Sequence, residues 1–485
     1  MQGVQVKDIV YTERISLADE SGELKPTEIK HDIKVDQKVP RLGVMLVGWG
    51  GNNGTTFTAG VIANKKKMTW NSKQGQQSAN FYGALTQSVS VHCGFKKTSA
   101  GGLEDVYKLV NEIVPLVNPC DMEMTGWDIS GMNLYDAAYR AQVMEPTLIE
   151  AMKADLSSLV PLKAVFNPKY VASNQADRAD NVFSGTNLEC VEKLRKDIRD
   201  FKAKVDSVVV LWTANTEEYY HEDIMTKEDL EKKITSDAPI PSSILYAYAT
   251  ALEKTVFLNG SPQNTVSPGL IQLVRENNTF IGGSDFKTGQ TKFKSIMADF
   301  FIGTGLKLSS CMSYNHLGNN DGKNLSEPQT FKSKEISKAG VLDESINSNK
   351  VLYPEGDNKI DHTIVIKYCP FVGDSKRAMD EYISKIFMNG WFTLVSHATC
   401  EDSLLAVPIM YDLVLLAEFF TRVTVDDKNL GPVLSYLNFF FKAPVSNNEH
   451  YTFNSFSRQK LTLVNLLKVL GGLTPDDSTL LGIGF

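Results

Sequence analysis

Cysteine is scarce in this 485-residue sequence, and its spacing is wide. No two cysteines form a C-x-x-C pair, which excludes a zinc ribbon and argues against a disulfide framework. The seven histidines also form no metal-ligand pattern, so the sequence predicts no metal site. The spacing instead fits reduced thiols. The cysteines are Cys93, Cys120, Cys190, Cys311, Cys369 and Cys400.

Two further absences concern membranes and secretion. The longest apolar run, residues 404–420, is interrupted by Pro408 and Asp412, and it is shorter than the roughly 20 uninterrupted apolar residues that a spanning helix needs. The N-terminal sequence MQGVQVKDIVYTERIS has neither the basic nor the apolar segment of a secretory signal. We therefore expect a cytoplasmic protein with no membrane partner.

An excess of positive charge is also missing. The chain has 50 Lys and Arg against 57 Asp and Glu, a net charge of −7, and such a field repels polyanions, which argues against a nucleic-acid partner. With 42% hydrophobic and 22% charged residues, the composition is that of a soluble globular protein. Its length allows about three domains or one elaborated fold.

A glycine-rich turn is the first positive signal. Residues 42–47 form an apolar run that ends in GWGGNNG at 48–54, and a helix is expected at 55–67. Strand, glycine turn and helix in this order are typical of a dinucleotide site, because the glycines let a pyrophosphate approach the helix N-terminus. Asn53 stands where the generic spacing has glycine, and an ordinary strand-to-helix turn is the alternative.

An acidic residue for a cofactor ribose is missing from its usual place. It would stand about 20 residues after the turn, but no Asp or Glu occurs between Asp36 and Glu104. Either an acid from elsewhere holds the ribose, or no ribose is bound. Asp128, in the segment GWDISGMN, is one candidate, although this residue type also suits a turn or a helix N-cap.

The rest of the chain alternates strand and helix patterns, which indicates a doubly wound α/β fold followed by a second α/β region from about residue 291. Residues 1–40 suit an arm or edge strands, and the polar stretch 315–328 has a composition that should not form core. The expected strands are 205–212, 256–258, 362–368 and 391–396, and the expected helices are 242–254, 374–387, one from residue 400 onward, and 459–470.

Polar and basic residues form a second group of candidates. The segment NNDG at 319–322 suits either an exposed turn or a ligand site at the end of a strand. Lys334 and Lys338 share a helix face, which is either solvated or binds an anion. Lys376 falls in the first turn of the helix expected at 374–387, where a phosphate would offset the macrodipole. Lys442 follows an aromatic run and either snorkels or is desolvated enough for acid-base work.

Ten motifs together resemble one family, the eukaryotic-type myo-inositol-1-phosphate (inositol-3-phosphate) synthases. The resemblance extends from about residue 10 to the final helix. The motifs are GWGGNNG, GWDIS, ASNQADR, LWTANTEEY, NGSPQNT, GQTKFKS, SYNHLGNNDGKNLS, FKSKEISK, KYCPFVGDSK and CEDSLLA.

The resemblance implies an NAD-dependent isomerase that converts D-glucose 6-phosphate to 1L-myo-inositol 1-phosphate, the first step of inositol biosynthesis. Oxidation at C5 acidifies C6, enolisation and attack of C6 on the C1 aldehyde close the ring, and reduction at C5 completes the reaction. Oxyanions develop at O5 and O1, so buried ammonium groups suit this chemistry. NAD remains bound, because the net reaction is redox-neutral.

The resemblance also implies a homotetramer and a Rossmann-like NAD domain that is split by an inserted α/β domain. The expected divisions are an N-terminal arm packing on the catalytic domain (1–40), an NAD-binding domain (41–291), a catalytic and tetramerisation domain (292–405) and a C-terminal return to the NAD-binding domain (406–485).

Site residues are assigned by matching each family motif. Those implied for NAD are Gly48, Gly50, Gly51, Asn52, Asn53, Gly54, Asp128, Gln175, Arg178, Thr213, Ala214, Asn215, Gly260, Ser261, Asp285, Asn319, Asn320, Asp321, Gly373, Asp374 and Asp402. Those implied for the substrate phosphate are Thr288, in place of the serine of the yeast-type pattern, with Gly289, Gln290, Lys338 and Lys376. Those implied for catalysis are Lys334, Lys338, Lys376, Lys442, Asp285, Asp321 and Asp402.

Two other functions remain open at this point. An NAD-dependent sugar-phosphate dehydrogenase would share the glycine turn and the lysines, and it would differ by releasing NADH. A non-catalytic NAD-binding assembly protein would keep the fold, but the presence of all four matching lysines argues against it.

Overall fold

The computed structural model describes residues 5–99, 101–221, 223–356, 359–447 and 452–476. Its largest sheet is fully parallel and contains six strands. In spatial order they are β12 (Ile281–Gly283), β11 (Val256–Asn259), β10 (Ser207–Trp212), β3 (Leu42–Val47), β8 (Glu123–Asp128) and β9 (Leu162–Lys163). The order reverses between β3 and β10, and in doubly wound sheets ligands bind at the carboxyl ends of the strands beside such a reversal.

Apolar side chains on both faces of this sheet explain why its central strands read as continuous hydrophobic runs. Val44 and Leu46 of β3 belong to one core cluster and Met45 and Val47 to the other, as expected for a sheet covered on both sides. The first cluster includes α1 (Asn52–Lys65), α15 (Asp402–Thr421) and α16 (Phe456–Leu470), and the second includes α7 (Asn187–Lys202), α8 (Lys227–Thr235), α9 (Ser242–Leu252) and α10 (Pro268–Glu276).

Helix α15 contains the apolar run noted in the sequence. By length and hydropathy it is the one helix among the described residues that could cross a membrane, but 78% of its most apolar window is buried inside the protein. Asp412, which interrupts the run, accepts hydrogen bonds from the backbone nitrogens of Leu85 and Thr86. The helix is therefore built as a core helix, packed on α1 and β10.

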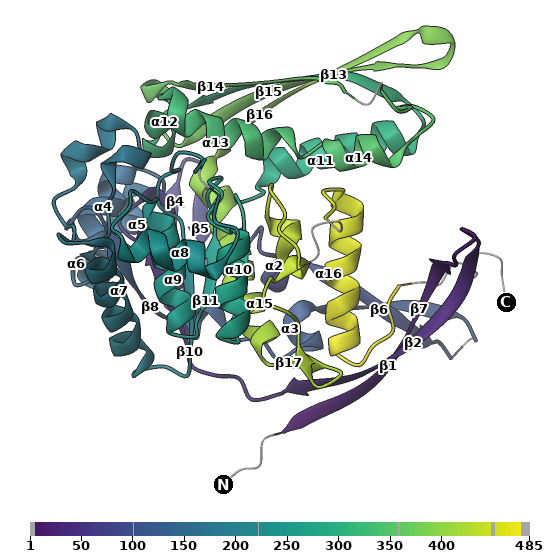
Figure 1. Cartoon of the computed structure of the whole chain (residues 1–485), viewed down its shortest axis with the longest axis horizontal. Helices are drawn as coiled ribbons and strands as arrows, with labels where there is room; N and C mark the ends of the chain where they lie inside the picture. The colour runs from purple at the N-terminus through teal and green to yellow at the C-terminus, as the bar shows by residue number, and fades with distance from the viewer. Residues whose placement is uncertain (1–4, 100, 222, 357–358, 448–451, 477–485) are drawn as a thin grey trace.

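A second sheet has four strands and lies at the top of Figure 1. They are β14 (Asp361–Tyr368), β13 (Lys307–Leu317), β15 (Ser375–Lys385) and β16 (Trp391–Glu401). One face is covered by helices that lie between the two sheets in Figure 1: α11 (Gly289–Gly303), α12 (Asn320–Asn324), α13 (Pro328–Ala339) and α14 (Asp343–Ser348). No helix or strand among the described residues covers the other face, where Tyr314, Val365 and Met379 are partly exposed.

The N-terminal segment forms a long antiparallel hairpin of β1 (Val6–Ala18) and β2 (Leu24–Asp36). Strand β2 then pairs with β17 (Val423–Val425), which pairs with β18 (Lys428–Asn429). Among the described residues the arm is thus paired with the C-terminal segment 406–485. Its packing on the catalytic domain stays a prediction.

The remaining described β-strands and α-helices are short. They are β4 (Thr69–Ser72), β5 (Gly75–Ser78), β6 (Ser90–Lys97), β7 (Leu103–Leu109), α2 (Leu85–Ser88), α3 (Val110–Ile113), α4 (Leu134–Ala141), α5 (Pro146–Ala151) and α6 (Lys153–Ser157).

Two expectations about the second region were wrong. Residues 374–387 do not form a helix, because Ser375–Lys385 is strand β15, whose buried positions alternate from Lys376 onward. Several of these inward residues are polar, so the hydrophobic pattern gave no period of two. The polar stretch 315–328 does contribute to the interior: Asn315 and Asn324 are buried, and hydrogen bonds satisfy their amide nitrogens.

Candidate functional site

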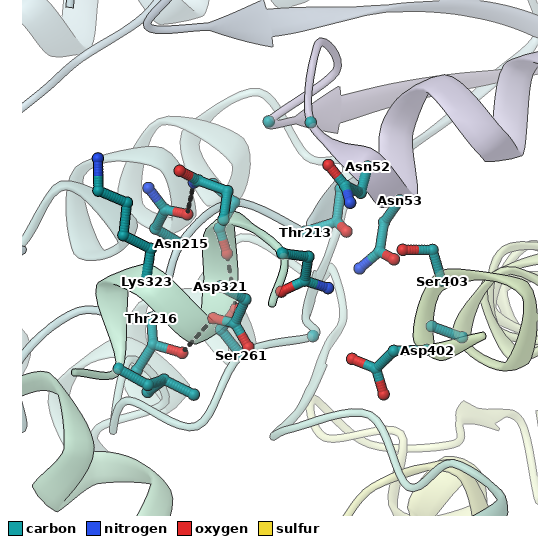
Figure 2. A pocket seen from close by; sticks show the side chains of 18 of the residues that line it. Asn52, Asn53, Thr213, Asn215, Thr216, Ser261, Asp321, Lys323, Asp402 and Ser403 are labelled. Carbon is teal, nitrogen blue, oxygen red and sulfur yellow. Dashed lines mark hydrogen bonds between the residues drawn. The ribbon is translucent and has the colours of Figure 1, made fainter. Parts of the chain in front are cut away.

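A cavity of about 470 Å³ lies at the carboxyl ends of the parallel strands, beside the reversal of strand order. Residues of both regions line it, and Figure 2 shows Asn52, Asn53 and Ser403 on one side of the cavity and Thr216 and Asp321 on the other. The long polar stretch after β13 folds back over the strand ends as α12. The cavity thus joins the glycine turn to the lysine-bearing part of the chain.

The glycine turn after β3 leaves no room for side chains. A Cβ on Gly48 would lie 2.7 Å from Ala214 Cα, and a Cβ on Gly54 would lie 2.4 Å from Trp49 O. Gly48 also has a φ of +89°, which disfavours other residues. Helix α1 begins at Asn52 without a capping side chain, so its first N–H groups are available to an anion. The turn therefore fits a pyrophosphate.

The acid missing after the glycine turn is found on the neighbouring strand. Asp128 ends β8, which pairs with β3, and its carboxylate accepts hydrogen bonds from Gly50 N at 2.9 Å and Ser130 N at 2.9 Å. Burial raises the pKa of Asp128, and the two backbone donors and Arg178 oppose that rise. The carboxylate keeps further acceptor capacity at the mouth of the turn, as a ribose diol requires.

The loops after β10 and β11 meet α12 across the cavity. Gln175 Oε1 accepts from both Asn215 Nδ2 (2.8 Å) and Asn320 Nδ2 (3.0 Å), and Ser261 Oγ donates to Ala214 O at 2.9 Å. Residues from four motifs are thus brought together. Thr213, Gly260, Asn319 and Arg178 line the same cavity.

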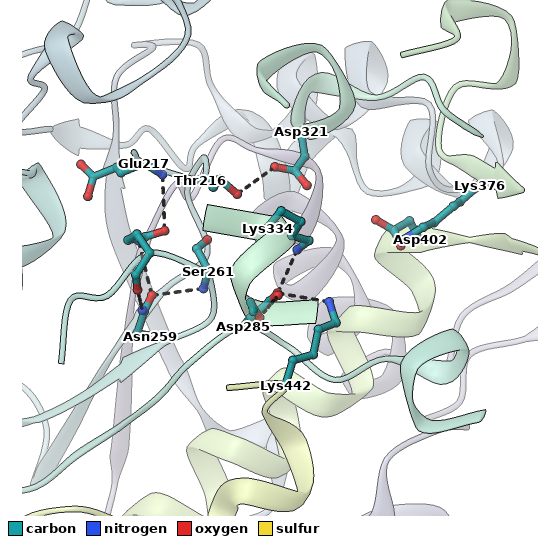
Figure 3. A network of polar contacts seen from close by, with 12 residues as sticks. Thr216, Glu217, Asn259, Ser261, Asp285, Asp321, Lys334, Lys376, Asp402 and Lys442 are labelled. Atoms are coloured by element: carbon teal, nitrogen blue, oxygen red, sulfur yellow. Dashed lines mark hydrogen bonds and ion pairs between the residues drawn. The ribbon is translucent and has the colours of Figure 1, made fainter. Parts of the chain in front are cut away.

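Two lysines share one buried carboxylate on the far side of the cavity (Figure 3). Asp285 Oδ1 accepts from Lys334 Nζ at 2.9 Å and from Lys442 Nζ at 3.2 Å, and Oδ2 accepts from Ser337 Oγ at 2.7 Å. Burial opposes the charge on Lys334, but Asp285 and Asp321 outweigh it and raise the pKa of that lysine. Burial, together with the Lys334 and Lys376 charges, lowers the pKa of Lys442 to about 7.

A second set of contacts ties the glycine turn to β15 and α15. Asp374 Oδ1 accepts from Asn52 Nδ2 (3.3 Å) and Asn319 Nδ2 (2.8 Å), and Oδ2 accepts from Ser403 N (2.8 Å). Lys376 Nζ donates to Asp402 Oδ1 at 3.2 Å. Lys376 therefore points into the site because it occupies an inward position of a strand, not the first turn of a helix.

Lys338 is the most exceptional lysine of the group. Its side chain lies on the buried face of α13, the residue is 4% exposed, and it has no hydrogen-bond partner among the described residues. Burial and the charges of Lys376, Lys442, Lys294 and Lys334 lower its pKa well below the ordinary value. Such a group favours an anion nearby.

The residues expected to hold a phosphate lie at the start of α11. Thr288 is its N-cap and makes no capping hydrogen bond through its side chain. Thr288 and Lys376 line the cavity, whereas Gly289, Gln290 and Lys338 do not. Of these five residues, Thr288 and Lys376 are thus the two that reach the cavity in this structure.

Motif matching missed two hydroxyl donors. Ser337 Oγ donates a hydrogen bond to Asp285 Oδ2 at 2.7 Å, and Ser403 Oγ donates one to Asp374 Oδ1 at 2.9 Å. Their positions in the sequence gave a weak indication, because Ser337 is three residues after Lys334 on the same helix and Ser403 directly follows Asp402. Among the described residues, no group of three or more His, Cys, Asp or Glu could hold a metal ion.

Comparison with known proteins agrees with this geometry. The family model described as myo-inositol-1-phosphate synthase matches residues 42–468. The chain belongs to the myo-inositol-1-phosphate synthase family. Within this family it is 49% identical to inositol-3-phosphate synthase of Brassica napus and 50% identical to inositol-3-phosphate synthase 1 of Oryza sativa subsp. japonica, in each case over 94% of this chain and 91% of the relative.

Solved structures show the same architecture. The inositol-3-phosphate synthase of Caenorhabditis elegans superimposes with a TM-score of 0.95 and 43% identity, over 100% of this chain and 96% of that one. A synthase-related protein from Thermotoga maritima gives 0.66 at 20% identity, over 90% of this chain and all of that one, and shares the fold. The expected α/β class with a Rossmann-like NAD-binding sheet is confirmed, as is the family resemblance.

Proposed function

We propose that this chain is an NAD-dependent inositol-3-phosphate synthase, an isomerase that converts D-glucose 6-phosphate to 1L-myo-inositol 1-phosphate. The observation that carries the proposal is the pair Lys334 and Lys442 on the single buried carboxylate of Asp285, next to a dinucleotide-type crevice. A crevice alone would suit many dehydrogenases. Two lysines deep in the same cavity suit a reaction in which negative charge develops on two substrate oxygens, O5 and O1.

The glycine turn, Asp128 and the loops after β10 and β11 are assigned to NAD, with the pyrophosphate at the N-terminus of α1 and the adenosine ribose on Asp128. Close packing of Gly48 and Gly54 and the uncapped helix support this assignment. Bound NAD supplies a nicotinamide that takes hydride from C5 and returns it after cyclisation. Asn319, the N-cap of α12, and Asn320 and Asp321 in its first turn line the same cavity and are assigned to NAD as well.

The substrate phosphate is assigned to the first turn of α11, with Thr288, Gly289 and Gln290, between Lys338 and Lys376. Lys338 supports this most strongly, because a buried lysine without a partner is unstable as a cation until an anion arrives. The dianion would restore its charge. Lys376 keeps its contact with Asp402, which orients it toward the same end.

The two lysines on Asp285 are assigned different roles, since their environments move their pKa values apart. Lys442, with a pKa of about 7, accepts the proton of the C5 hydroxyl as hydride leaves. Lys334, whose pKa is raised, stays charged and stabilises the oxyanions at O5 and O1. Asp285 Oδ1 holds the Nζ atoms of both lysines in place, and Ser337 donates to the other oxygen of that carboxylate.

A homotetramer is proposed from the open face of the second sheet. Val365, Tyr314 and Met379 are cross-strand neighbours on β14, β13 and β15, and they are 39%, 40% and 46% exposed. An apolar row of this kind on an uncovered sheet favours burial against another copy. A tetramer mass in light scattering, reduced by Met379→Glu, is the expected result. A cytoplasmic location is proposed from the cysteines, which are all free thiols.

Incubation with glucose 6-phosphate and NAD tests the proposed activity. Periodate should release inorganic phosphate from the inositol product, while NADH absorbance should stay near the level of the bound cofactor. Stoichiometric NADH with no inositol phosphate would select the sugar-phosphate dehydrogenase instead. Absence of both products would select the non-catalytic alternative.

A further inference from the structure

A buried polar chain lies between α11 and the second sheet, outside the cavity lining. Its members are Asp380 on β15, Ser313 on β13, and Gln290 and Lys294 on α11. Asp380, Ser313 and Lys294 are 2%, 0% and 4% exposed. The antiparallel register sets Ser313 opposite Asp380, and Gln290 and Lys294 are one helical turn apart on the same face.

The hydrogen bonds of this chain have only one consistent direction. Lys294 Nζ donates to Ser313 Oγ, and because an ammonium can only donate, the Ser313 proton must go to Asp380 Oδ1. Asp380 Oδ2 accepts from Gln290 Nε2 at 3.4 Å. Lys294 Nζ also lies 3.2 Å from Nε2 of His362, which is neutral, since burial and the charges of Lys294 and Lys338 lower its pKa to about 3.

We propose that Asp380 is a positioning residue of the substrate-phosphate site, acting through Gln290 and, by way of Ser313, through Lys294. The inference rests on the proposed function, because it takes the start of α11 as the seat of the phosphate. The Asp380 carboxylate attracts the NH2 group of Gln290 and repels its Oε1. The second N–H of Gln290 is thereby kept for an anion, which Oε1 would repel.

Lys294 completes the arrangement by balancing charge. A buried carboxylate beside a phosphate site would weaken anion binding if it stood alone. The Lys294 ammonium, linked through Ser313, leaves the pair without net charge. The carboxylate can therefore orient Gln290 without opposing the phosphate, and the first two turns of α11 are fixed to the sheet at both Gln290 and Lys294.

Asp380→Asn tests this role because it keeps the shape and removes the charge, which lets Gln290 rotate. The KM for glucose 6-phosphate should rise about tenfold, with kcat lowered less than about threefold and the Kd of NAD unchanged. Asp380→Glu should recover part of the loss. Glu381→Gln, one residue further along β15 and on its other face, removes the same charge and should keep the wild-type KM.

Ser313→Ala is the second variant, which matters if Asp380→Asn does not fold. It cuts only the link to Lys294, and the KM should rise about threefold. A wild-type protein that makes no inositol phosphate would refute the proposed function itself. If the wild type is active, two results would refute the positioning role: both variants keep the wild-type KM, or both shift the KM and the Kd of NAD equally. A change in thermal stability does not alter either conclusion.

Discussion

Replacing Lys338 by Met should weaken binding of the substrate phosphate more than it affects NAD binding or the chemical steps of the reaction. Lys338 has no hydrogen-bond partner among the described residues and is 4% exposed, so the variant removes a cation without freeing a buried acid. A charge-assisted hydrogen bond contributes about 1.5–3 kcal/mol, which corresponds to about 10- to 160-fold in KM for glucose 6-phosphate. Binding of sorbitol, which lacks the phosphate, should be nearly unchanged.

The same lysine predicts a pH dependence with a definite sign. Burial and its lysine neighbours lower the pKa of Lys338 in the free protein, and a bound dianion raises it, so binding takes up a proton between those two pKa values. Affinity is therefore full at low pH and falls as pH rises through this window, by up to about tenfold per pH unit.

Calorimetry measures this uptake directly. Glucose 6-phosphate is titrated into the protein with NADH present, which blocks the first oxidation, in Tris and in HEPES at a pH where the phosphate is a dianion. The wild type should take up close to one proton, and Lys338→Met should take up much less. Equal uptake by the two proteins, or a KM that Lys338→Met leaves unchanged, would refute the assignment of Lys338 to the phosphate.

Four further outcomes follow from the site. Asp128→Asn, which replaces the carboxylate held by Gly50 N, should weaken NAD binding about tenfold in a fluorescence titration without changing the phosphate-dependent step. Single-turnover NADH formation should rise as pH increases through about 7, since only the neutral amine of Lys442 accepts a proton, and Lys442→Met should lose both the rate and its pH dependence. EDTA should leave turnover unchanged. Hydrogen exchange in residues 315–343 should slow when NAD and substrate bind, because the lysines of this segment repel one another until an anion arrives, and equal exchange in both states would count against ligand-induced ordering.

The nucleotide half of the fold could be predicted from local pattern. Strand β3, the glycine turn and α1 appear in the sequence as an apolar run, four closely spaced glycines and a helical segment, and β10 and β11 appear as short apolar runs. These elements bury apolar residues on regular faces. The hydrophobic pattern of the sequence therefore predicts the structure correctly in elements that are held in place mainly by burial of apolar side chains.

The second region resisted this approach because its buried face is polar. Strand β15 directs Lys376, Asp380 and Ser384 inward, which hides the period of two and made the segment resemble a helix. The side chain of Asn324, a fully buried residue, accepts a hydrogen bond from Ala172 N and donates one to Thr216 O, both in distant segments. Such partners are long-range and leave no local signal. The four lysines were candidates from their local sequence, whereas Asp285 was assigned only through the family motifs.

The central claim is that oxidation and reduction at C5 occur within one catalytic cycle on a cofactor that is not released. Glucose 6-phosphate deuterated at C5, incubated with less NAD than protein sites and an excess of unlabelled free NADH, tests it by mass spectrometry of the product. The account predicts inositol phosphate that retains the deuterium over many turnovers. Product that has lost the label to the free NADH pool, or label that accumulates in free NADH without inositol phosphate, would contradict it.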